Sequence, residues 1–446
     1  MTGIDQVIWN ITRDEDLFCI WGLATLEEPL KDDLILKTLE YLIKMIPILN
    51  SKPVCNRLYG KWRFLKKENV EDLITRINTQ TDEAAHEQIK QVFLNPIDPT
   101  AFSMIRLISI DGPLKHYFVI QVHHLVVDGE GLKRICVKFA EIYQKLYKNK
   151  DWKPSEVLDP CRSWGQIARN FNARHLWLII KASIINTYKI FIFNLSHRTR
   201  FHLMGDVNAD DGTSTSAPLY FESIRIEEKS MLKLKAFAKR QGFTVNDIFM
   251  SSLALATLKW NKDRGDSPEW LGFGYTANLR RWWGEPKGTF GNYSVVLMHE
   301  ETRDNLQTPS TALACTKRKV DIIKTFIGLD AFLAMMQLKM TPYFLVMPLS
   351  VWLKKKLIAF LKNGHAMTNI GIVFEEAGNF GHTKAIDYSF LAPTFPGGCK
   401  IYTITTYKNV TTIHLGCSED SLRKVSAVNF LQLWKQMMED LAEIGV

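Results

Sequence analysis

Two adjacent histidines, His123 and His124, are followed by Asp128 and Gly129. Imidazole is the side chain whose unperturbed pKa lies closest to neutral pH, so a histidine aimed at a substrate can accept a proton from it. Consecutive residues that leave a strand point in different directions, which lets one imidazole face a cleft while the other faces the interior. We therefore predict that His124 is a general base and that His123 supports it.

The residues around this pair predict a strand that ends at the histidines and a helix that begins just after them. Apart from Gln121, residues 117–122 are apolar, aromatic or β-branched, as in a buried strand. After Gly129, which permits a backbone conformation or a close approach that a Cβ atom would block, apolar residues recur at helical spacing. These residues are Leu132, Ile135, Phe139, Ile142, Tyr143 and Leu146.

Other interpretations of these residues remain open at the level of sequence. Asp128 can orient a histidine, as in a hydrolase triad, or hold the loop through a distant cation, and we favour the second role. The histidines can also be hydrogen-bonded core residues. A zinc site lacks a nearby ligand set, so we predict no metal. No Gly-x-Ser-x-Gly segment occurs, and Cys136 falls within the expected helix, so a serine or cysteine nucleophile is not indicated.

The complete signature His123–Gly129 resembles that of the HHxxxDG CoA-dependent acyltransferase superfamily. This superfamily includes nonribosomal-peptide condensation domains, wax ester synthase/diacylglycerol acyltransferases, plant alcohol acyltransferases and chloramphenicol acetyltransferase. The resemblance implies an α/β fold of two chloramphenicol-acetyltransferase-like lobes, with mixed sheets flanked by helices and an active-site tunnel between them. It also implies a monomer.

Other segments fit the resemblance. Residues 17–53 look like the first strand and helix of the superfamily, and Thr244–Ile248 looks like an Asn-Asp helix start of the wax-ester-synthase branch. Thr244 and Asp247 also form a capping-box pair, which is an architectural role in its own right. The Asp-Phe-Gly-Trp-Gly signature of the plant enzymes is absent, which leaves the other branches open.

The resemblance also implies roles for residues of the second half. Arg280 follows the apolar strand 271–275, and the superfamily has an arginine there that pairs with the motif aspartate. A buried pair with Asp128 would be bidentate and would fix the loop that carries His124. Asn292 and Ser294 are expected near the tunnel, as groups that can meet an acyl oxyanion. Thr368–Gly371 and Gly397–Gly398 look like the region where one half crosses to the other.

The length of the chain, 446 residues, exceeds what one ordinary core accommodates, so two domains are expected. An acidic and Ser/Thr-rich stretch interrupts the apolar pattern. We predict a first lobe over 1–204 that carries the motif, a linker over 205–217 and a second lobe over 218–446. Seven dispersed cysteines and the lack of a signal peptide favour the cytoplasm.

Two apolar stretches, 176–194 and 344–361, contain too many polar residues for a membrane span. Their flanking basic residues fit either a helix on a bilayer surface or buried helices of a large core. The formal net charge of +9 can attract anionic lipid, an acidic carrier protein or the phosphates of coenzyme A. No nucleic-acid motif accompanies this charge, so nucleic acid is not an expected partner.

The resemblance, together with these residues, implies an acyltransferase of lipid or secondary metabolism. His124 would accept the proton of a small-molecule hydroxyl or amine acceptor as it attacks a thioester, without a covalent acyl-enzyme. The donor would be acyl-CoA or a phosphopantetheinyl thioester, used as a cosubstrate rather than a bound cofactor. The alternatives are a free-standing condensation enzyme that uses an acyl carrier protein, and a non-catalytic scaffold or binding protein.

Overall fold

The computed structural model describes most of both halves of the chain. The described residues are 1, 5–6, 8–9, 18–55, 60–65, 70–100, 103–158, 162, 172–173, 177, 180–181, 203–205, 218–280, 290–322, 364–394 and 399–443.

The first half builds a mixed five-stranded sheet in the order β11-β1-β6-β5-β4. Its strands are β1 (Cys19–Leu26), β4 (Ile74–Asn78), β5 (Ile105–Asp111), β6 (His116–His123) and β11 (Ala385–Leu391). Only β4 and β5 pair in parallel. Alternating residues of these strands supply two cores, as the period of two in a strand requires. One core packs on α2 (Asp32–Met45) and α4 (Gly129–Lys148), and the other packs on α3 (Asp82–Leu94).

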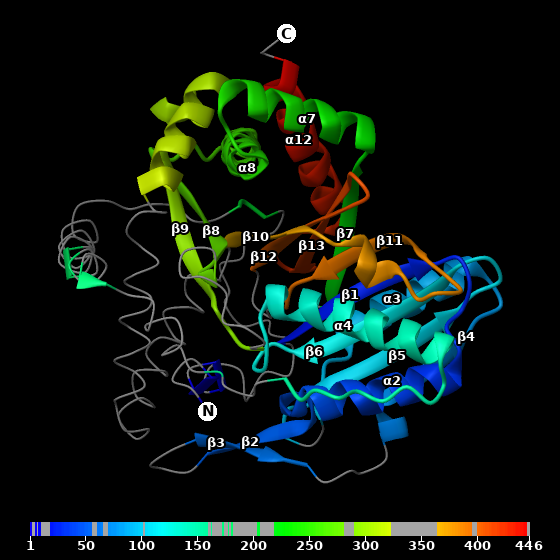
Figure 1. The fold of residues 1–446 in the computed structure, drawn as a ribbon. Helices are drawn as coiled ribbons and strands as arrows, with labels where there is room; N and C mark the ends of the chain where they lie inside the picture. Colours follow the sequence, from blue (N-terminus) through cyan, green and yellow to red (C-terminus); the bar gives the residue numbers. More distant parts are fainter. Residues whose placement is uncertain are drawn as a thin grey trace.

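The second half builds a mixed six-stranded sheet in the order β7-β13-β12-β10-β8-β9. Its strands are β7 (Leu219–Ile226), β8 (Trp270–Asn278), β9 (Ser294–Thr302), β10 (His365–Ile372), β12 (Lys400–Tyr407) and β13 (Val410–Ser418). Three helices lie together on one side of it (Figure 1) and share its core; they are α7 (Glu228–Gln241), α8 (Val245–Lys262) and α12 (Lys424–Glu443). The expected capping box of Thr244 and Asp247 begins α8.

A further helical stretch covers 309–322, and smaller elements accompany the two sheets. They are the hairpin β2 (Ser51–Cys55) and β3 (Gly60–Phe64) and the 3-10 turns η1 (Pro47–Asn50), η2 (Val70–Leu73), η4 (Asp304–Leu306) and η5 (Glu375–Gly378).

Strand β11 joins the two halves, because it comes from the second half of the chain but pairs with β1 along most of its length. The turn before β11 places Phe380 in the first core, where its ring meets those of Phe118 and Phe139. The crossover expected at Thr368–Gly371 is therefore made by the next strand, since these residues lie in β10. Gly397 and Gly398 lie outside the described residues.

The structure confirms the two-lobed α/β architecture with mixed sheets, the strand before the histidine pair and the helix after it. Of the expected linker 205–217, only Gly205 is described, so the boundaries stay a prediction. The apolar stretches 176–194 and 344–361 lie outside the described residues except at three positions of the first. Among the described helices, none is long and apolar enough to cross a bilayer.

Candidate active site

The histidine pair lies where β6 ends. The His123 side chain is fully buried, whereas His124 is partly exposed. The backbone amide of His124 donates to the carbonyl of Phe18 at 2.8 Å, and the two rings of these residues lie 4.9 Å apart. The structure thus separates the two imidazoles as the strand end predicts, and His124 is the one nearer to solvent.

Asn292, which precedes β9, holds the ring and the backbone of His124 together. Its Nδ2 donates to the carbonyl oxygens of His124 and Leu125 at 2.9 and 3.0 Å, and its Oδ1 lies 3.1 Å from Nδ1 of His124. Carbonyl oxygens only accept, which fixes the orientation of the amide, and an amide oxygen also only accepts. Nδ1 of His124 therefore carries the proton, and the lone pair of the neutral ring is on Nε2.

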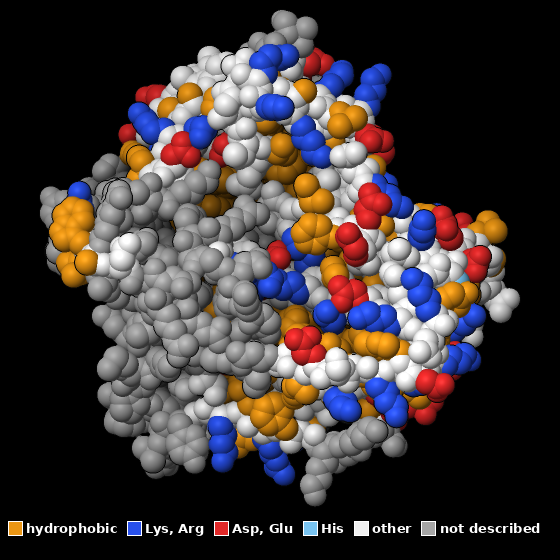
Figure 2. All heavy atoms as spheres, in the orientation of Figure 1, with side chains coloured by type: hydrophobic (Ala, Val, Ile, Leu, Met, Phe, Trp, Pro, Cys, Tyr) orange, Lys and Arg blue, Asp and Glu red, His pale blue; other side chains and the backbone are white. Residues whose placement is uncertain are grey.

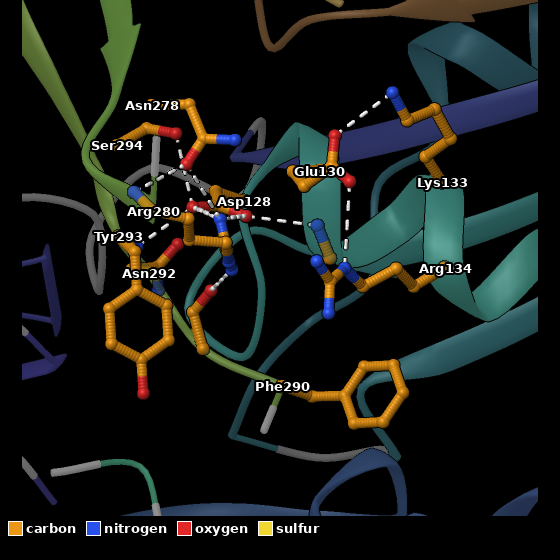
Figure 3. A network of polar contacts seen from close by, with 12 residues as sticks. Asp128, Glu130, Lys133, Arg134, Asn278, Arg280, Phe290, Asn292, Tyr293 and Ser294 are labelled. Carbon is orange, nitrogen blue, oxygen red and sulfur yellow. Dashed lines mark hydrogen bonds and ion pairs between the residues drawn. The ribbon is translucent and has the colours of Figure 1, made fainter. Parts of the chain in front are cut away.

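Asp128 is the N-cap of α4 and the centre of a polar network (Figure 3). Its carboxylate accepts from the backbone amides of Gly131 and Tyr293 at 2.9 and 2.7 Å and from Oγ of Ser294 at 3.0 Å. Nη1 of Arg280 donates to both carboxylate oxygens, at 3.0 and 2.8 Å. Among the described residues, the carboxylate makes no hydrogen bond to either histidine, so the contacts agree with a loop anchor rather than a triad member.

Arg280 also reaches the segment that carries Asn292. Its Nη2 donates to the carbonyl of Gly291 at 3.0 Å, and its guanidinium carbon lies 4.6 Å from the centre of the Tyr293 ring. Both contacts to Asp128 come from one nitrogen, so the pair is present but is not the two-nitrogen fork that we expected. The second nitrogen is used to fix Gly291 instead.

The electrostatics of the site follow from burial and from this ion pair. Burial opposes the charge of Asp128, but the charge and hydrogen bonds of Arg280, together with the backbone amides of Gly131 and Tyr293, outweigh it and hold the pKa of Asp128 below its usual value. Burial lowers the pKa of His123 to about 3. Burial also lowers the pKa of His124, against the opposing effects of Asp128 and Asn292. Burial thus favours the neutral form of both rings.

Gly129 lies where α4 meets β10 of the second sheet. A Cβ atom at this position would lie 2.5 Å from Cδ1 of Ile370. One turn further along α4, the ammonium of Lys133 donates to the carbonyl oxygens of Ile370 and Ile372, both at 3.3 Å, and pairs with Glu130 at 2.9 Å. The glycine therefore permits the close approach of the two lobes beside the histidines.

Asn292 and Ser294 require a revision of the oxyanion role expected for them. Both amide hydrogens of Asn292 are used by carbonyl oxygens of the chain, and the Ser294 hydroxyl donates to Asp128. Neither side chain has a donor left for an acyl oxyanion in this arrangement. Both residues lie at the site, but their contacts hold His124 and Asp128 in place.

Four residues at the site were missed by the sequence reasoning: Lys133, Arg162, Asn278 and Tyr293. Tyr293 acts through its backbone amide, which carries no signature in the residue type. Asn278 accepts from the amide of Arg280 at 3.0 Å and ends the strand that was recognised, so its position gave a usable signal. Arg162 is isolated in the sequence from every recognised motif.

Among the described residues, no group of three or more His, Cys, Asp or Glu side chains is arranged to hold a metal ion.

No protein-family model matches the sequence, and a search of curated proteins finds no match. Solved structures do match, over almost the whole chain. The epimerization domain from the third module of tyrocidine synthetase B is 14% identical, with a TM-score of 0.71, over 99% of this chain and 95% of that one. The first condensation domain of the calcium-dependent antibiotic synthetase is 11% identical, with a TM-score of 0.69 and the same coverage.

A third similar structure is the trichothecene 15-O-acetyltransferase from Fusarium sporotrichioides. It is 10% identical, with a TM-score of 0.68, and the match covers 99% of this chain and 94% of that one. At such identities the likeness establishes the fold. This chain therefore has the two-lobed fold of condensation domains and of the acyltransferases built like them.

Proposed function

We propose that this protein is an acyltransferase that moves an acyl group from a thioester to a hydroxyl or amine acceptor. The observation that carries the proposal is the contact between Asn292 and His124, which puts the proton on Nδ1 and the lone pair on Nε2. A neutral imidazole in a fixed tautomer, partly exposed at the meeting of two lobes, is suited to general-base catalysis.

In the proposed reaction, Nε2 of His124 takes the proton of the acceptor while the acceptor oxygen or nitrogen attacks the thioester carbonyl. The tetrahedral intermediate then collapses, the carbon–sulfur bond breaks, and the imidazolium returns its proton to the leaving thiolate. The acyl group passes directly to the acceptor, so no covalent acyl-enzyme forms. Asp128 and Arg280 keep the loop in place and carry no proton.

The donor is proposed to be acyl-CoA, a cosubstrate rather than a bound cofactor. The net charge of +9 favours a phosphate-bearing donor. On the face shown in Figure 2, Lys and Arg side chains are scattered among Asp and Glu side chains rather than gathered in one basic patch. On this face, charge alone therefore does not mark the residues that would bind the phosphates.

A second candidate is a free-standing condensation enzyme whose donor is tethered to an acyl carrier protein. The similarity to a condensation domain of an antibiotic synthetase favours it. In both cases we propose a monomer in the cytoplasm with no nucleic-acid partner. A membrane surface remains a proposed contact, because Trp177 and Ile180 of the apolar stretch are more than half exposed and the ammonium of Lys181 lies 5.1 Å from the Trp177 ring centre.

The proposal is tested by thiol release from acyl-CoAs of graded chain length, with alcohol or amine acceptors present or omitted. Acceptor-dependent release, with the acylated acceptor detected by mass spectrometry, is the expected result. Release only from an acyl-phosphopantetheinyl carrier protein would favour the condensation enzyme. If no acyl group were transferred from either donor, both enzymatic functions would be contradicted, and a non-catalytic scaffold would be the interpretation that fits.

A further inference from the structure

Arg162 lies outside the histidine motif, yet its guanidinium contacts several segments around it. Its Nη1 donates to the carbonyl oxygens of Val126 and Phe290, the latter at 2.8 Å. Its Nη2 donates to the carbonyl of Leu125 at 3.2 Å and to Oδ1 of Asp5 at 2.8 Å. One guanidinium therefore binds the loop after the histidines, the segment before Asn292 and a carboxylate from the start of the chain.

The ion pair of Arg162 and Asp5 is in the interior of the protein. Asp5 is 1% exposed and Arg162 is 9% exposed. The second oxygen of Asp5 accepts from Nε1 of Trp62 at 3.3 Å, and the Arg162 guanidinium carbon lies 5.5 Å from the Trp62 ring centre. A buried pair with such contacts has a defined geometry, unlike a pair at the surface.

Arg162 contacts both segments that position His124, namely the loop after the histidines and the segment before Asn292. The Leu125 carbonyl accepts from both Asn292 and Arg162, so these two side chains share one oxygen. On the other side, Arg162 holds the carbonyl of Phe290, directly before the Gly291 carbonyl that Arg280 holds. The position of Asn292 relative to His124 therefore depends on a contact of Arg162 with each of the two segments.

We propose that Arg162, anchored by Asp5, is a positioning residue for His124. Together with Arg280 it clasps the loop 124–128 to the segment 290–292, and it acts through Asn292 rather than on substrate. The inference rests on the proposed function for its effect on turnover, but its effect on the tautomer of His124 is independent of any reaction. A displacement of about 1 Å at a catalytic group can cost about a hundredfold in rate.

The first test reads the tautomer directly, by NMR of the protein labelled with nitrogen-15 in its histidines, with the His124 signals assigned from His124→Ala. We expect the Nδ1-protonated form in the unaltered protein. Arg162→Lys keeps a cation beside Asp5 but cannot reach all the carbonyls, so His124 should shift toward a mixture of tautomers. Arg225→Lys is the matched control, since Arg225 pairs with Asp387 at 2.8 Å near the surface. An unchanged tautomer in Arg162→Lys overturns the inference, whether or not the protein turns over.

The second test compares kcat and KM in a double-mutant cycle with Asn292→Ala. Arg162→Lys is expected to lower kcat by about tenfold to a hundredfold with little change in KM. In the Asn292→Ala background, the same substitution should lower kcat by less than about threefold, since its route to His124 is gone. Equal losses in both backgrounds would mean that Arg162 only stabilises the fold. Absence of turnover in the unaltered protein would contradict the proposed function instead.

Discussion

The carboxylate of Asp128 is surrounded by hydrogen-bond donors, and its two oxygens accept from all of them. It accepts from two backbone amides, a hydroxyl and a guanidinium, and it is 1% exposed. Its lowered pKa keeps it ionised, so it has no proton to give at neutral pH. Its contribution is to join the start of α4 to Arg280 and Ser294 of the second lobe.

Asp128→Asn is expected to lower the free energy of unfolding by about 3–5 kcal/mol, because it leaves the buried charge of Arg280 without its partner. Urea denaturation measures the change. Asp111→Asn is the control, since Asp111 meets His116 at 3.0 Å at a site that solvent reaches, where a pair contributes about 1 kcal/mol or less. Equal losses in the two variants would contradict the account.

For individual residues, the sequence predicted which of them belong to the site better than it predicted the contacts that they make. The family resemblance that the signature carries, rather than any local pattern, implied that Arg280 pairs with Asp128 beside His124. The contacts of Asn292 could not be anticipated, because they depend on which way its amide turns within the folded site. Arg162 gave no signal, since its partners are backbone carbonyls and a carboxylate 157 positions away.

Helix α4 and strand β10 meet at Gly129, where the two lobes touch beside the site. The helix begins there because Asp128 caps it, and Lys133 ties its second turn to the β10 carbonyls. A Cβ atom at Gly129 would lie 2.5 Å from Cδ1 of Ile370, so the end of that side chain would have to move. The lobes therefore touch at this point through the backbone of Gly129 and the tip of one aliphatic side chain.

Gly129→Ala is expected to lower the melting temperature and the rate of acyl transfer only modestly, because Cδ1 of Ile370, the movable end of that side chain, must shift away from the new methyl. Ile370→Val lacks that atom and should restore much of both in the double variant. Gly131→Ala is the matched control: its Cβ would meet Cβ of Val127 at 2.8 Å, so Ile370→Val should not rescue it. If Ile370→Val rescued neither Gly129→Ala nor Gly131→Ala, or rescued both, this role of Gly129 would be contradicted.

Local patterns predicted the elements that carry the motif. The apolar run before His123 gave β6, the helical spacing after Gly129 gave α4, and the capping box gave the start of α8. Strand β11 was not predicted as part of the first sheet, because its partner β1 lies more than 350 residues earlier. No local pattern in the sequence encodes a pairing across such a separation.

The two lobes complete one site. The first supplies His123, His124 and Asp128, and the second supplies Arg280 and Asn292. The shared β11 and the polar contacts at Asp128 join the lobes where the proposed reaction takes place. The site is therefore expected to lose its geometry when the lobes separate, before either sheet unfolds.

Stability is expected to fall as the pH falls below about 6.5. Burial lowers the pKa of His123 and His299 to about 3 and that of His414 to about 4. Between these values and the unfolded value of about 6.5, the unfolded chain takes up protons that the folded protein does not. Each histidine then removes about 1.4 kcal/mol per pH unit.

Urea denaturation at pH 7, 6 and 5 measures this dependence. The free energy of unfolding should change little near pH 7 and decline steeply toward pH 5. His299→Gln should reduce the slope of the free energy of unfolding against pH by about 1.4 kcal/mol per pH unit, the contribution of one histidine. A stability that is the same at pH 7 and pH 5 would contradict the burial of these neutral rings.

The most direct test of the account compares acceptor-dependent thiol release in His124→Ala and His116→Ala. His116 lies at the opposite end of the same strand, at the hairpin with β5. Removal of a general base is expected to lower the rate about a hundredfold to ten-thousandfold, while His116→Ala keeps it. If folded His124→Ala transfers acyl groups as fast as the unaltered protein, His124 is not the base and the proposed mechanism fails.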